Sequence, residues 1–248
     1  EVNGQMVEGA KYARLDVESW INNDKWYNRA AGYYGMFLRD IADELGVAKG
    51  FVGKDKVFNS GLKRIINQIG GVGVAQNVVN AMKVIRWNCK YGRKPDKINM
   101  MGWSRGAVTC IRIAYALSQD NNLKSIPVNI FAVDPVAGNN AYKDVGAKTI
   151  NDNVKNFVST LARGEIRSKF TPTDHRVIEN YSDKTMLILP LKGIHDDTAY
   201  WTNPAGVITF NLCYRFLDKL GSKVPKSLSM FKMSNKGMLT QYDKLRKD

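Results

Sequence analysis

The chain has 248 residues, 44% of them hydrophobic and 24% charged, with a formal net charge of +14 at pH 7. This composition excludes a disordered chain, and the length predicts one large globular domain or one domain with a small appendage. No apolar run is long enough for a transmembrane helix, and the N-terminus lacks the basic and apolar blocks of a signal peptide.

Three cysteines, Cys89, Cys110 and Cys213, lie far apart in apolar helical contexts. They are too few and too scattered for a disulfide framework or a zinc site. We therefore expect buried thiols, a reducing compartment, and no metal or other cofactor.

The positive charge is unevenly distributed. The first fifty residues are slightly acidic, so the remaining residues carry more than the whole excess, and the C-terminal tail is strongly basic. Such an excess favours anionic partners, namely acidic lipid surfaces, acidic proteins or nucleic acid, or it is simply a solvated basic surface. No nucleic-acid-binding module is recognisable, so nucleic acid is the least favoured partner.

Hydrophobic periodicity predicts the secondary structure in chain order. Apolar residues at helical spacing predict helices over residues 17–45, 72–87, 106–118 and 205–220. A loop rich in Gly and Lys is expected over residues 46–61. Short apolar runs typical of buried strands occupy residues 97–103, 128–133, 154–160 and 185–191. Because strands alternate with helices, we expect an α/β fold with a mostly parallel central sheet and helices on both faces.

The same pattern indicates the domain organisation. Residues 1–220 are expected to form one domain, in which residues 1–60 are a helical and loop N-terminal part. Residues 221–248 are expected to form a basic C-terminal extension, either as an amphipathic segment or docked on the domain.

Residues 102–107, Gly-Trp-Ser-Arg-Gly-Ala, contain a G-x-S-x-G motif between an expected strand and an expected helix. A sharp strand-to-helix turn exposes a serine hydroxyl to substrate, and Gly102 and Gly106 permit that turn. This placement predicts Ser104 as a nucleophile and the backbone N–H of Arg105 as an oxyanion donor. The alternative is a tight turn that carries an incidental serine.

A nucleophilic serine needs a base, and the chain has two histidines, His175 and His195. His195 follows an expected buried strand, where sites form in open α/β sheets, whereas His175 lies in a polar stretch after no clear strand. We therefore favour His195 as the base, and a surface-loop histidine as the alternative.

The third member of a catalytic triad orients the histidine. Asp134 directly follows the expected strand 128–133, and the order Ser104, Asp134, His195 is that of α/β-hydrolase triads. In the alternative, Asp134 only caps a turn before Pro135. The other candidates for the third member are Asp174, Asp183, Asp196 and Asp197.

The elbow at residues 102–107 resembles the G-F-S-R-G-A elbow of an uncharacterised-domain family of α/β hydrolases, which includes phospholipase effectors of bacterial type VI secretion. Residues 131–138, 161–172 and 193–197 are similar, in the same order, to its Asp-ending strand, its A-x-D-E-x-R-x-x-F-x-P segment and its G-x-H-x-D segment. The resemblance implies that Ser104, Asp134 and His195 are the catalytic residues. It also implies that Glu165, Arg167 and Asp197 are scaffold or site-supporting positions.

The chain departs from that family at two points. Residues 198–201, Thr-Ala-Tyr-Trp, replace the Gly-rich turn after the H-x-D segment, and the family's D-G-T segment is absent, so no second oxyanion donor is assigned. The resemblance implies an α/β-hydrolase-like serine esterase or lipase that acts on an ester or phospholipid, and an effector that acts in another cell. The alternative is a catalytically silent hydrolase fold that binds an anionic membrane or a host protein.

Overall fold

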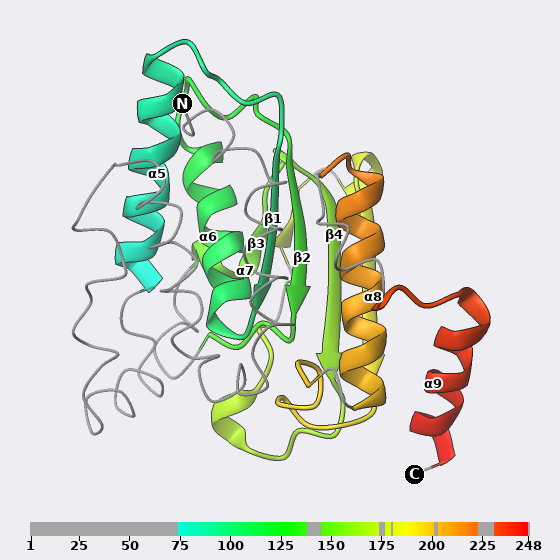
Figure 1. Ribbon diagram of the computed structural model, residues 1–248. Helices are drawn as coiled ribbons and strands as arrows, with labels where there is room; N and C mark the ends of the chain where they lie inside the picture. Colours follow the sequence, from blue (N-terminus) through cyan, green and yellow to red (C-terminus); the bar gives the residue numbers. More distant parts are fainter. Residues whose placement is uncertain are drawn as a thin grey trace, which may run out of the picture.

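The computed structural model describes residues 74–137, 145–173, 177–179, 181–200, 203–222 and 231–247 (Figure 1). The expected helix 17–45 and the expected loop 46–61 lie outside these residues. All four expected strands are present as β1 (Ile98–Trp103), β2 (Val128–Val133), β4 (Val154–Ala162) and β6 (Thr185–Leu191). They form one sheet in the order β1-β2-β4-β6, and every pairing is parallel.

Helices cover both faces of this sheet, as the alternating pattern predicts. On one side lie α5 (Val74–Lys90) and α6 (Arg105–Ser118), and on the other lies α8 (Pro204–Lys219) (Figure 1). Every residue of β1 and β2 is buried. Double coverage explains why these strands read as continuous apolar runs. The α/β fold and the mostly parallel sheet are therefore confirmed.

Alternate side chains of the strands enter two cores. Met100 and Ile130 belong to the core beneath α6, whereas Met101, Trp103 and Phe131 belong to the core beneath α8. This period of two is the geometry of a strand. It directs Trp103, the residue before the expected nucleophile, toward the α8 side.

A ladder of asparagine side chains fixes the register of three strands. Asn129 Nδ2 donates to Asn99 Oδ1 at 2.7 Å, and Asn156 Nδ2 donates to Asn129 Oδ1 at 2.6 Å. Buried amides must be paired, so a slip of one strand by a single residue would break these bonds. The ladder thereby aligns the opposite ends of β1 and β2, where the candidate site lies.

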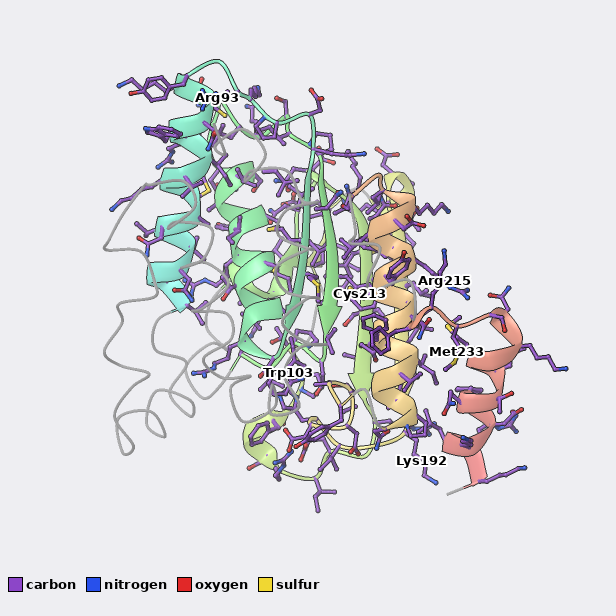
Figure 2. All side chains as sticks on the ribbon, in the orientation of Figure 1. Arg93, Trp103, Lys192, Cys213, Arg215 and Met233 are labelled. Carbon is purple, nitrogen blue, oxygen red and sulfur yellow. The ribbon has the colours of Figure 1, made fainter. Side chains whose placement is uncertain are left out.

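The basic C-terminal extension is docked on the domain. It contains α9 (Asn235–Lys247), which packs along α8. Arg215 of α8 donates to Asn235 Oδ1 at 2.5 Å and to the Met233 carbonyl at 2.7 Å (Figure 2). Asn211 Oδ1 accepts from the Met233 N–H at 2.6 Å.

Five short elements carry too few residues to show a periodicity. They are α7 (Val145–Lys148), β3 (Thr149–Ile150), β5 (Val177–Ile178) and the 3-10 helices Ser168–Phe170 and Tyr181–Asp183. Parallel pairing joins β3 to β5 in a separate small sheet.

The cysteines only partly follow the expectation of buried thiols. Cys110 and Cys213 are buried, but Cys89 is half-buried, because it lies at the edge of the core near the end of α5. Burial raises the pKa of the Cys89 thiol. Among the described residues, no helix is both long enough and apolar enough to cross a membrane.

Candidate active site

Ser104 lies at a strained turn between β1 and α6. Its backbone has φ 57° and ψ −127°, a conformation that non-glycine residues rarely adopt. Its N–H donates to the Val133 carbonyl at 2.9 Å, and its carbonyl accepts from the Val108 N–H at 3.3 Å. The sheet and the helix therefore hold the serine from both sides, which is the geometry that a G-x-S-x-G elbow requires.

The residues that flank Ser104 occupy the positions expected of them. Gly102 is buried in β1 and Gly106 is buried in the first turn of α6. Arg105 is the first residue of α6, where backbone N–H groups have no carbonyl partner within their own helix. Burial lowers the pKa of the Arg105 guanidinium to about 10, because the charged form loses its hydration.

Asp134 follows β2 on the strand next to that of Ser104 and is fully buried. Its backbone has φ 39°, and its N–H donates to the Thr160 carbonyl at 2.7 Å. One carboxylate oxygen, Oδ1, accepts from the Ala162 N–H at 2.9 Å, and the other, Oδ2, lies 2.5 Å from His195 Nδ1. The backbone of β4 thus orients the carboxylate toward the imidazole.

His195 and Asp134 come together although 61 positions separate them in the sequence. A carboxylate only accepts hydrogen bonds, so Nδ1 of the imidazole is the donor and Nε2 carries the lone pair of the neutral ring. His195 is 1% exposed. This pair has the geometry of the histidine and acid of a catalytic triad.

Two aromatic rings hold the imidazole. Trp103 stacks on it with a centroid distance of 4.8 Å and an interplanar angle of 22°, and Phe170 contacts it at 5.0 Å. Figure 2 shows Trp103 at the carboxyl end of the sheet. Because Trp103 directly precedes Ser104, this stacking brings the imidazole beside the elbow.

The hydrogen bond between Ser104 and His195 is not formed. Within the described part of the chain, His195 Nε2 is buried and has no hydrogen-bond partner. A nitrogen with a lone pair and no donor is costly to bury. Such bonds are often long in substrate-free enzymes and shorten when substrate binds.

An ion pair supports the backbone of His195. Glu165 Oε2 accepts from the His195 N–H at 3.0 Å. Arg167 donates to both oxygens of Glu165, at 2.8 Å from Nε and at 2.6 Å from Nη2. The hydrogen bonds from Arg167, aided by the His195 N–H, lower the pKa of Glu165 to about 2, and the same pairing raises the pKa of Arg167.

Arg167 also contacts the aromatic ring of Phe170 and the carboxylate of Asp196. Its guanidinium carbon lies 4.1 Å from the centre of the Phe170 ring, and its Nη2 lies 3.4 Å from Asp196 Oδ2. One arginine therefore connects the carboxylate that holds the His195 backbone with the aromatic ring that packs on the His195 side chain.

Asp197 holds the loop that carries His195. Its Oδ2 accepts from the Ile194 N–H at 2.8 Å, and its Oδ1 accepts from Asn203 Nδ2 at 3.1 Å. Asn203 in turn caps α8 through Ala205 N–H at 2.9 Å. At Gly193, φ is 128° and a Cβ would lie 2.8 Å from Asp197 Oδ2, so this loop requires glycine there.

The other acidic candidates that the structure describes do not occupy the position of Asp134. Asp183 is exposed and precedes β6, at the opposite end of the strand from His195. Asp196 pairs with Arg167, and Asp197 is used within the loop. His175 and Asp174 lie outside the described residues.

Sequence reasoning missed the rings that hold the imidazole. Trp103 and Phe170 come from distant segments, and no periodicity links either of them to His195. The described residues hold no group of three or more His, Cys, Asp or Glu side chains arranged to bind a metal ion.

Comparison with known proteins gives one weak structural similarity to report and no family. No family model matches the chain, and no curated protein matches it. A solved structure of an uncharacterized protein from Pseudomonas aeruginosa is similar at a TM-score of 0.47 and 14% identity. The match covers 97% of this chain and 41% of that protein, so the chain spans about two fifths of its length.

Proposed function

We propose that the protein is a serine hydrolase that cleaves carboxylic esters through Ser104, His195 and Asp134. The observation that carries this proposal is the buried hydrogen bond from His195 Nδ1 to Asp134, beside a serine at a strained strand-to-helix turn. A fully buried histidine and carboxylate are costly to keep in a core unless they are paired and used. Their position at the carboxyl end of a parallel sheet is where such folds bind ligands.

The first half of the proposed reaction forms an acyl-enzyme. Ser104 Oγ attacks the ester carbonyl carbon while His195 Nε2 takes the hydroxyl proton, and Asp134 stabilises the resulting imidazolium. The Arg105 N–H donates to the oxyanion of the tetrahedral intermediate. When the intermediate collapses, the C–O bond to the alcohol breaks and Nε2 returns the proton to the leaving alkoxide.

The second half repeats these roles with water. Nε2 removes a proton from water as the water oxygen attacks the acyl carbon, and Ser104 leaves with that proton when the free acid is released. For both halves, Ser104 Oγ and Nε2 must approach to hydrogen-bond distance when substrate binds.

We further propose that the ester belongs to a lipid or phospholipid. Two features support this substrate class: the resemblance of residues 102–107 to a hydrolase family that includes phospholipases, and the net charge of +14, which favours anionic surfaces. The rival proposal is the silent hydrolase fold. It is favoured by the missing hydrogen bond at Nε2 and predicts binding without hydrolysis.

Replacing Ser104 tests the catalytic proposal. Ser104→Ala is expected to lower kcat/KM for a soluble short-chain ester by roughly 10⁴- to 10⁶-fold, because the nucleophile is lost while the fold remains. The matched control is Ser182→Ala, an exposed serine before β6, which should leave kcat/KM unchanged. Equal turnover by wild type and Ser104→Ala, or no turnover by either, would contradict the proposal.

A further inference from the structure

The docked C-terminal helix α9 carries a basic and partly apolar face that the proposed reaction does not use. Leu245 faces inward, where it packs with Leu191 and Ile208. On the outer side, Leu239 is 62% exposed and Tyr242 is 45% exposed. With Arg246 they recur at spacings of three and four residues, so they share one face of the helix.

The charge of α9 is strongly positive. Four of its exposed side chains are basic, against one acidic side chain, Asp243. The basic residues are Lys236, Lys244, Arg246 and Lys247. A second copy of this positively charged chain would be repelled by such a face, whereas an anionic partner would be attracted.

The position of α9 links this face to the candidate site. Leu245, in its last turn, packs on Leu191, the final residue of β6, and His195 follows four positions later. Figure 1 shows the carboxyl end of α9 at the same end of the molecule as the carboxyl ends of the strands, and Figure 2 shows Lys192 near that end. Lys192 is exposed and adds a further positive charge there.

We propose that the outer face of α9, together with Lys192, docks the protein on an anionic lipid surface with the candidate site close to the membrane. An aliphatic and an aromatic side chain among lysines and arginines is the pattern of helices that lie in a membrane interface. There the leucine enters the acyl region, the tyrosine sits at the headgroups, and the basic side chains pair with lipid phosphates. The choice of lipid over another polyanion rests on the proposed function, because a lipid surface would also present the substrate.

Vesicle binding by the full chain tests this proposal separately from catalysis. The Ser104→Ala background keeps the lipid intact during the measurement. This protein should bind phosphatidylcholine vesicles that contain phosphatidylglycerol, and it should bind pure phosphatidylcholine weakly. The triple variant Lys244→Gln, Arg246→Gln, Lys247→Gln should bind the anionic vesicles roughly a hundredfold more weakly, because each basic residue near a membrane contributes about a fivefold factor.

A matched triple variant controls for net charge. Lys83→Gln, Arg93→Gln and Lys97→Gln remove the same charge from exposed positions in α5 and in the segment that joins α5 to β1. This control should bind anionic vesicles as tightly as Ser104→Ala alone does. When Ser104 is kept, both triple variants should hydrolyse a soluble ester at the wild-type rate. Equal losses in the two triples would overturn the proposal, because they would show a dependence on total charge alone.

Two further variants separate lipid from other polyanions. Leu239→Gln and Tyr242→Gln should each weaken vesicle binding by roughly tenfold, and this loss should persist at high salt, which screens charges but not apolar insertion. Binding to polyglutamate or duplex DNA as tight as binding to anionic vesicles would overturn the choice of lipid. Unchanged vesicle binding by Leu239→Gln and Tyr242→Gln would also overturn the choice of lipid.

Discussion

At the scale of single residues, the carboxylate of Glu165 holds the backbone of His195 in place. Its pKa is about 2, below its ordinary value of 4.5, because Arg167 and two backbone N–H groups bind the charged form. A depressed pKa in the folded state means that ionised Glu165 stabilises the fold above the unfolded pKa. That stabilisation is lost as the pH falls from about 4.5 toward about 2.

Glu165→Gln should therefore make the free energy of unfolding less dependent on pH in the acid range. We expect the variant to be less stable than wild type at neutral pH and the difference to shrink as the pH falls through the window from 4.5 to 2. Urea unfolding at a series of pH values measures this difference. Glu179→Gln is the control, because Glu179 also accepts a backbone N–H, at 2.9 Å, but pairs with none of the arginines that the structure describes. A difference between wild type and Glu165→Gln that stays constant with pH would contradict this account.

Much of the candidate site could be read from single residues. Ser104 is marked by the glycines around it, and His195 by the small number of histidines in the chain. Asp134 is marked by its place after an apolar run. The stacking of Trp103 and Phe170 on the imidazole could not be read, because it depends on how strands and loops far apart in the sequence pack together.

At the scale of elements, α8 approaches the loop that carries His195 without space for a side chain. A Cβ at Gly206 would lie 1.8 Å from the Tyr200 carbonyl oxygen and 3.0 Å from the Asp197 carbonyl oxygen. Both neighbours are backbone atoms, so neither can rotate away. Glycine in the first turn of α8 therefore allows the helix to hold the loop in place.

Gly206→Ala should lower the free energy of unfolding by about 3 kcal/mol or more, because overpacking against backbone forces the helix and the loop apart. The matched control is Gly237→Ala in α9, where a Cβ would lie 2.6 Å from the flexible side chain of Met233. There the helix-forming advantage of alanine, about 1 kcal/mol, should offset the adjustment of Met233. Urea unfolding of both variants checks the contrast, and equal destabilisation would show that the contact with Tyr200 is not the cause.

The elements themselves could largely be predicted from periodicity. The four main strands and the helices α5, α6 and α8 begin and end within a few residues of their expected bounds. The two-residue strands β3 and β5 could not be predicted, because strands so short carry no alternation. The exposure of side chains on β6, an outer strand of the described sheet, could not be predicted either. Its sequence is as apolar as those of the buried strands.

At the scale of the whole molecule, the chain carries a net charge of +14, and its fold buries a paired histidine and carboxylate. The sequence indicated an anionic partner but not the surface that meets it, because net charge has no position. Docking of α9 against β6 and α8 places its basic residues toward the end of the sheet where the strands deliver Ser104, Asp134 and His195. In the arrangement that we propose, attraction to an anionic surface and the hydrolysis would act at the same end of the fold.

Covalent labelling with a fluorophosphonate, followed by peptide mass mapping, tests most directly whether His195 and Asp134 activate Ser104. The wild-type chain should carry the adduct on Ser104, Asp134→Asn should react about ten-thousandfold more slowly, and Asp183→Asn should react at the wild-type rate. An adduct confined to another residue, or equal labelling rates in wild type and Asp134→Asn, would contradict the account.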